Sequence, residues 1–202
     1  MVKVLILIAS MLLAFTARAS DVPIEELRFP DQQLQKCVLA MAQQQHIHSS
    51  RDMEYLQCAF EGNVSLAGIK QLPELKSLVL SGGEINDLPA LNHIPALRDI
   101  LLSRVNLNKV DKLNKPDLDV VFSRVTLNDW RDLAKVHVST IAIKSPGSCS
   151  QYRPLMRDKR VALVIKGASD KQISQGMLQV YNGDKNVFVS LDCERADILT
   201  PL

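Results

Sequence analysis

Few groups of side chains in this sequence have the types and spacing needed for acid–base or metal chemistry. His46 and His48 are separated by one residue, so a strand would place both imidazoles on one side. No cysteine or carboxylate accompanies them at the spacing of a zinc site, which favours a loop over a metal centre. Asp99 and Asp119 form a spaced pair of carboxylates, but solvated polar positions explain them without acid–base catalysis. The sequence contains no glycine-rich phosphate loop, nucleophile elbow or HExxH motif. We therefore predict a protein without catalytic residues, metal or cofactor.

The first residues have the pattern of an export signal. Lys3 is followed by the apolar run 4–15 and then by Ala17-Arg18-Ala19, a small-x-small cleavage site. The apolar run is shorter than the roughly 20 residues of a membrane-spanning helix. We predict that residues 1–19 are a cleaved signal peptide, that the mature chain is periplasmic or secreted, and that it does not insert in a membrane. An uncleaved membrane anchor is the alternative.

Removal of this signal changes the net charge. The full chain has 24 basic and 22 acidic residues, and Lys3 and Arg18 leave with the signal, so 22 basic residues face 22 acidic ones. A mature chain of zero net charge has no general attraction to nucleic acid or to an anionic membrane. We therefore expect another protein as the partner, and no nucleic acid.

Apolar residues at i and i+2 recur every 20 to 22 residues, which indicates short strands that each bury one face. The pairs are Leu56 and Cys58, Leu78 and Leu80, Ile100 and Leu102, Val120 and Phe122, and Ile141 and Ile143. Leu75 and Leu97 precede their pairs by three residues, whereas Asp117 occupies that place in the fourth unit and Leu118 is expected to compensate. Further apolar columns with a spacing of three follow each pair, so a short helical turn should return the chain to the next strand.

A strand and a helical turn every 20 to 22 residues, with the pattern LxxLxL, resemble a leucine-rich repeat. Units such as LKSLVLSGGEINDLPALNHIP (residues 75–95) are similar to the repeats of internalin-type bacterial proteins, and FPDQQLQKCVLAMAQ (residues 29–43) resembles their helical cap. The resemblance implies an α/β fold, a short solenoid with a parallel sheet on its concave face. It assigns residues 20–52 to the N-terminal helical cap and 53–144 to the repeats. The asparagine expected on the turn is missing, because Gly83 and Arg104 stand near that place, so we expect less regular turns.

The residues between the paired positions point outward from the predicted sheet. From the second unit onward this outward row is apolar, with Val79, Leu101 and Val121 at its centre, and serines follow it. The nearly identical segments LLSRVNL (101–107) and VFSRVTL (121–127) place two arginines one repeat apart. We predict a protein-binding face at this surface. The predicted contact residues are Val79, Asp99, Leu101, Arg104, Asp119, Val121 and Arg124. The alternative is that the aliphatic residues are only good strand formers, or are covered by the C-terminal part of the chain.

Residues 145–202 interrupt the regular period. The run RVALVIKG (160–167) predicts a strand, in which Leu163 and Ile165 continue the buried column and make a sixth repeat strand possible. Asn182-Gly183 indicates a hairpin. We predict a β-rich C-terminal cap here. A small α/β domain is the alternative, and it would carry an enzyme or ligand site, with a pocket lined by Tyr152, Arg153 and Arg157.

Four cysteines in an exported chain favour disulfides, with three possible pairings. Cys37 falls on the predicted cap helix and Cys58 on the first repeat strand, which that helix should cover, while Cys149 and Cys193 fall in the closing region. Pairing Cys37 with Cys58 and Cys149 with Cys193 would fasten each end of the stack. Buried free thiols at Cys37 and Cys58 are the alternative.

Overall fold

A computed structural model describes residues 21–144, Leu155, 161–166 and 187–192. The predicted signal peptide, the pairing of Cys149 with Cys193, the Asn182-Gly183 hairpin and the pocket predicted around Tyr152 all lie outside the described residues.

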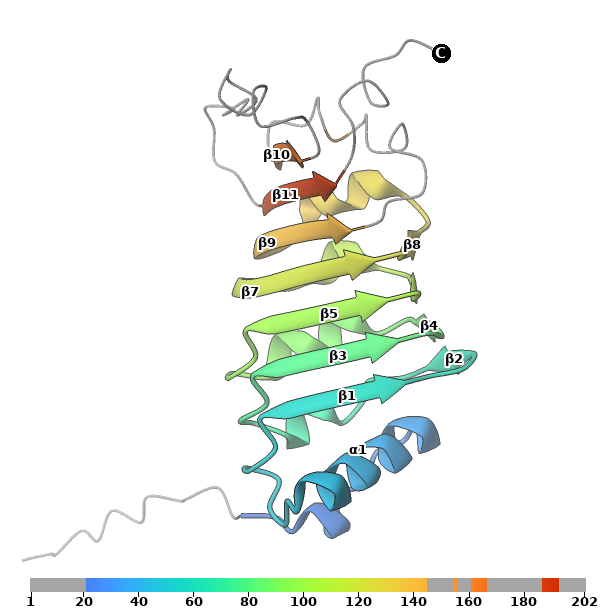
Figure 1. The fold of residues 1–202 in the computed structure, drawn as a ribbon, viewed down its shortest axis with the longest axis vertical. Coiled ribbons are helices and arrows are strands. Elements are labelled where there is room, and N and C mark those ends of the chain that lie inside the picture. Colours follow the sequence, from blue (N-terminus) through green and yellow to red (C-terminus); the bar gives the residue numbers. More distant parts are fainter. Residues whose placement is uncertain (1–20, 145–154, 156–160, 167–186, 193–202) are drawn as a thin grey trace, which may run out of the picture.

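The main sheet is a parallel stack of one long strand from each unit (Figure 1). Its first five strands are β1 (Tyr55–Ala59), β3 (Ser77–Ser81), β5 (Asp99–Ser103), β7 (Asn114–Ser123) and β9 (His137–Lys144). The pairing places the first member of each predicted apolar pair beside its counterpart: Leu56, Leu78, Ile100, Val120 and Ile141 form one buried column. The predicted column is confirmed, and these parallel sheets make the chain an α/β protein.

A second, four-stranded parallel sheet follows the turns. It consists of β2 (Asn63–Val64), β4 (Glu84–Ile85), β6 (Asn106–Leu107) and β8 (Thr126–Leu127). Short 3₁₀ helices then lead back to the main sheet: η2 (Ile69–Gln71), η3 (Leu88–His93), η4 (Val110–Lys112) and η5 (Trp130–Lys135). Each unit therefore has a long strand, a short strand and a 3₁₀ helix around a buried aliphatic core, which is a leucine-rich-repeat-like arrangement.

An α-helix closes the lower end of the stack (Figure 1). Helix α1 (Gln32–Gln45) buries Leu34, Val38 and Ala42, and the preceding 3₁₀ helix η1 (Ile24–Glu26) lies beside it. The Asp31 carboxylate accepts hydrogen bonds from the Leu34 amide at 3.1 Å and, through its other oxygen, from the Ser65 amide at 2.9 Å. One side chain thus caps the helix and fastens it to the first unit.

The His46-Ile47-His48 segment is the loop that ends this helix. His46 is the helix C-cap with φ 55°, a left-handed conformation that stops α1. The His48 carbonyl accepts a hydrogen bond from the Ile24 amide at 2.8 Å. The backbone of this loop therefore holds the N-terminal segment against the cap.

The predicted Cys37–Cys58 disulfide joins α1 to β1, with 5.8 Å between the two Cα atoms. Cys58 is buried in the first strand, so the bond ties the cap to the core of the stack. Among the described residues, this pairing is confirmed.

The fourth unit is two residues shorter before Val120 than the units that precede it, and the chain compensates as predicted. Leu118 is buried although it precedes Val120 by only two residues, and Asp117 is exposed. The pairing of β7 with β9 shifts register between Lys115 and Asp119. The irregularity therefore keeps an aliphatic side chain in the core and turns a carboxylate toward solvent.

The order of strands beyond β9 differs from the prediction. The strand next to β9 is β11 (Val187–Asp192), and β10 (Val161–Lys166) pairs with β11 at the edge of the sheet. Leu163 aligns with Val189, which aligns with Ile141, so Leu163 is in register with the column as predicted, but its strand is the seventh in the sheet and not the sixth. The spacing of twenty-two residues predicts the register of a strand but not its neighbour in the sheet. A parallel crossover can place a strand from later in the chain between two earlier ones, as β11 lies between β9 and β10.

The turns after the long strands are regular, so the expectation of irregular turns is wrong. The Gly82 amide donates to the Ser103 carbonyl at 2.9 Å, and the Arg104 amide donates to the Ser123 carbonyl at 2.8 Å. Side-chain amides form a ladder farther along: Asn128 Nδ2 donates to Asn108 Oδ1, and Asn108 Nδ2 donates to Asn86 Oδ1, both at 2.6 Å. A polar ladder therefore exists, but it lies directly after the short strand of each of these units instead of on the turn before it.

Gly82 is the position where this array of turns is least tolerant of a side chain. Its φ is 71°, and an added Cβ would lie 2.5 Å from the Phe60 carbonyl oxygen. Gly62 also has positive φ, 64°, but an added Cβ would meet nothing within 4 Å. We expect Gly62→Ala to lower the free energy of unfolding by about 1 kcal/mol, the cost of the left-handed backbone alone. Gly82→Ala should cost about 3 kcal/mol because the steric clash adds to that strain. Urea denaturation of both variants measures the difference, and equal losses would contradict it.

The disulfide should stabilise the capped end by restricting the unfolded chain. We expect the double variant Cys37→Ala/Cys58→Ala to lose about 3 kcal/mol of unfolding free energy, as the chain-entropy model gives for a loop of this length. Urea denaturation under non-reducing conditions tests this, because any other disulfide stays intact. An unchanged midpoint would show that the bond contributes little to stability.

Candidate functional site

The outer face of the main sheet, on the side away from the 3₁₀ helices, carries a row of aliphatic side chains. Val79, Leu101, Val121 and Ala142 are consecutive pairing partners in β3, β5, β7 and β9. Each is only partly buried, whereas the residues on either side of it along the strand are fully buried. We call these four residues the apolar strip. Gln57 of β1 ends the strip with a polar group at the capped end.

Carboxylates lie along one side of this strip. Asp99 and Asp119 are exposed partners in neighbouring strands, two residues before Leu101 and Val121. Asp119 accepts a hydrogen bond from the Thr140 hydroxyl at 2.8 Å, and no ion pair involves either carboxylate within the described part of the chain. We call Asp99 and Asp119 the acidic rim.

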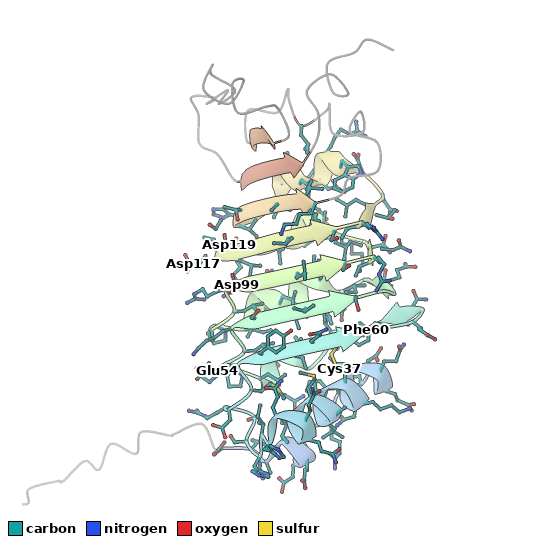
Figure 2. All side chains as sticks on the ribbon, in the orientation of Figure 1. Cys37, Glu54, Phe60, Asp99, Asp117 and Asp119 are labelled. Atoms are coloured by element: carbon teal, nitrogen blue, oxygen red, sulfur yellow. A yellow bond between two sulfur atoms is a disulfide. The ribbon has the colours of Figure 1, made fainter. Side chains whose placement is uncertain are left out.

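Asp117 is a third carboxylate near this rim, and it is not among the predicted contact residues. Figure 2 shows it beside Asp99 and Asp119 at the amino-terminal side of the sheet. The spacing of 20 residues between Ile100 and Val120, two fewer than in the preceding units, was the signal that could have found it, because the shorter segment lets Leu118 take the buried place and leaves Asp117 exposed. The carboxylate density at this rim is therefore higher than the repeat pattern indicates.

The basic side chains next to the acidic rim are engaged elsewhere. Arg98 Nη1 donates to the carbonyls of Pro95 and Leu97 at 2.9 and 3.0 Å. Lys76 pairs with Glu54 at 2.6 Å between Nζ and Oε1. Burial lowers the pKa of Lys115, the nearby Arg98 charge lowers it further, and Asp117 opposes both effects. These contacts leave the acidic rim without a basic neighbour bonded to it.

Two arginines lie on the opposite side of the strip, beyond the serines. Ser81, Ser103 and Ser123 are successive partners, and Arg104 and Arg124 follow the last two. Both arginines are exposed, and their side chains make no hydrogen bond or ion pair with any described residue. We call them the arginine pair. Neighbouring strands lie about 4.8 Å apart, so the two side chains can act on one ligand.

The backbone of the arginine pair is in an uncommon conformation. Arg104 has φ 54° and Arg124 has φ 56°, whereas Gly82 occupies the equivalent place one unit earlier with φ 71°. Left-handed backbone disfavours residues with a Cβ, and glycine or asparagine adopts it at lower cost. Arginine at both positions therefore costs stability, and such a cost points to a role of the side chain outside the fold.

Five of the seven predicted contact residues lie on this outer face, and Arg104 and Arg124 are exposed in the turns that directly follow its strands. Val79, Leu101 and Val121 form the strip, Asp99 and Asp119 border one side, and Arg104 and Arg124 border the other. The placement agrees with the sequence-based geometry, and binding itself stays a prediction.

The other surface features of the described residues are weaker candidates for a binding site than the outer face of the main sheet. A shallow hollow near η4 and η5 is open to solvent and mixes both charges. It is lined by Asp111, Lys112, Leu113, Asn114, Lys135 and His137. Within the described ranges, no group of three or more histidine, cysteine or acidic side chains is placed to hold a metal ion. The described helices include none that is long and apolar enough to cross a membrane.

Comparisons with known proteins identify no family for this chain and show a weak structural similarity. The sequence matches no protein-family model and no curated protein. Among solved structures, the chain is similar to an internalin from Listeria monocytogenes, with 15% sequence identity and a TM-score of 0.32. The similarity covers 87% of this chain and 60% of that one, so the chain spans about three fifths of the length of that internalin. A likeness at this level carries no argument about function.

Replacing an arginine of the pair should show whether its side chain contributes to the stability of the fold. We expect Arg104→Asn to keep or slightly raise the free energy of unfolding, within about 0.5 kcal/mol, because asparagine tolerates the left-handed conformation. Urea denaturation is the measurement, and Arg98→Asn is a control at an arginine that bonds to its own loop. A loss above about 2 kcal/mol for Arg104→Asn would show that the side chain serves the fold.

Proposed function

We propose that this chain is an exported, non-catalytic protein-binding module, a leucine-rich-repeat solenoid whose concave face is the outer face of the main sheet. The observation that carries the proposal is the apolar strip itself, a continuous row of partly exposed aliphatic residues, with charged groups on both sides that form no ion pair with a described residue. An apolar centre with a polar rim is the usual anatomy of a protein-binding surface.

The energetics of the strip support a protein partner. Burying a large aliphatic side chain contributes on the order of 1.5 kcal/mol, and Val79, Leu101 and Val121 each keep part of that surface exposed. The charged rims add selectivity more than affinity, because exposed ion pairs contribute about 0.2 to 1 kcal/mol each. The strip would thus supply binding energy, and the rims would select the partner and its orientation.

The Cys37–Cys58 disulfide supports export. Disulfides form and persist in the periplasm and outside the cell and are rare in the reducing cytosol. The alternative of an enzyme or ligand-binding domain concerns residues 145–202, most of which lie outside the described residues, and no specific feature of the structure favours it.

A charge placed in the strip should abolish partner capture without unfolding the protein. We expect Leu101→Asp and Val121→Asp to capture the native partner at least about tenfold less well, because a carboxylate would be desolvated at the centre of the interface. The measurement is affinity capture from the envelope fraction of the source organism, followed by mass spectrometry.

Thr126→Asp is the matched control for this experiment. Thr126 is close to valine in shape, exposed, and located on the second sheet at β8. It should capture the same partner as the unchanged protein. Circular dichroism and urea denaturation verify that all variants fold. Equal capture by the folded Val121→Asp variant and by the control would exclude the strip as the site.

A further inference from the structure

We propose that the segment bound on this face is an amphipathic α-helix that lies along the apolar strip, across the strands, with basic residues over the acidic rim and acidic residues over the arginine pair. This inference rests on the proposed function and specifies the chemistry of its partner. It follows from the spacing, the width and the charges of the outer face.

The spacing of the strip matches the pitch of a helix. Neighbouring strands are about 4.8 Å apart, and an α-helix advances about 5.4 Å per turn. A helix along the strip therefore presents about one turn to each unit, and the mismatch grows to only about 2 Å over the three steps from Val79 to Ala142. An extended segment in the same direction has side chains on one face every 6.8 Å or so, which does not match successive strands.

The width of the face also suits a helix. Asp99 and Arg104 are five residues apart along one strand and turn, so the two rims lie roughly 16 Å apart. A helix with its side chains is about 10 to 12 Å across, so it fits between the rims and its flanking side chains can reach both. Ser103 and Ser123 are small and leave the space between strip and arginine pair open.

The charges of the two rims select the helix. Asp99 and Asp119 form no ion pair with a described residue, while Lys76 and Arg98 are bonded to other groups. On the other side, the arginine pair is free of described partners, and exposed Lys144 extends the basic side next to Ser123. A helix with one kind of charge on both flanks would set like charges against one rim. A helix with lysines on one flank and glutamates on the other complements both.

Designed peptides test this directly. Three fluorescein-labelled 18-residue peptides share one leucine stripe and carry lysine on one flank and glutamate on the other, lysine on both, or glutamate on both. Fluorescence anisotropy at low ionic strength measures their binding to the full mature protein, after circular dichroism has verified equal helicity. We expect the split-charge peptide to bind at least about fivefold more tightly than either uniform peptide, as two exposed pairs changed from attraction to repulsion would give.

Two variants make the test specific to the rim and to the helix. Asp99→Lys/Asp119→Lys makes both rims basic, so it should prefer the all-glutamate peptide. A split-charge peptide with two central prolines cannot form the helix and should bind at least about tenfold less well. Thr126→Lys is the control protein and should keep the original preference.

The outcomes separate this inference from the proposed function. The inference of a bound amphipathic helix would be overturned by equal binding of the three peptides or by no binding of any peptide. It would also be overturned if the proline peptide bound as tightly as the split-charge peptide. If Val121→Asp still abolishes capture of the native partner, the binding face stands and its occupant has another form. If capture survives that substitution, the proposed function fails whatever the peptides do.

Discussion

The structure depends on the in-register parallel pairing of the five long strands. Because side chains alternate between the two faces of a strand, a slip of one residue would move Leu56, Leu78 and Ile100 from the core to solvent and the apolar strip into the core. The core and the outer face are therefore fixed by the same hydrogen bonds. Parallel pairing also gives the outer face its regular spacing, since each unit adds one residue to each outward row at an interval of one strand.

A stack of this kind is weakest at its ends, since each unit contacts only its neighbours. At the lower end, α1 covers the first unit, the Asp31 carboxylate bridges helix and repeat, and the Cys37–Cys58 bond makes the junction covalent. These three contacts act on the same interface, so they protect the edge at which unfolding would otherwise begin. The apolar strip starts one unit above this cap, where the stack is already fastened.

Sequence alone predicted the features that repeat, because a period reports which side chains share a face. The buried columns, the 3₁₀ turns, the Cys37–Cys58 bond and the positions of Leu101 and Val121 followed from spacing. Prediction from the sequence failed for features that the repeat period does not determine. The order of β10 and β11 depends on a crossover, and the regular turns depend on backbone hydrogen bonds between successive units rather than on an asparagine at the turn.

The backbone of Arg104 and Arg124 is the part of the site that no sequence pattern revealed. Gly82 shows that the turn accepts glycine at this place, yet the next two units use a long charged residue with positive φ. Neither guanidinium group is bonded to a described residue, so no described contact of these side chains offsets the cost of the left-handed backbone. Both arginines directly follow the serines that end their strands, and both are exposed. An anionic flank of a bound helix would give those two groups the partner that the chain itself does not provide.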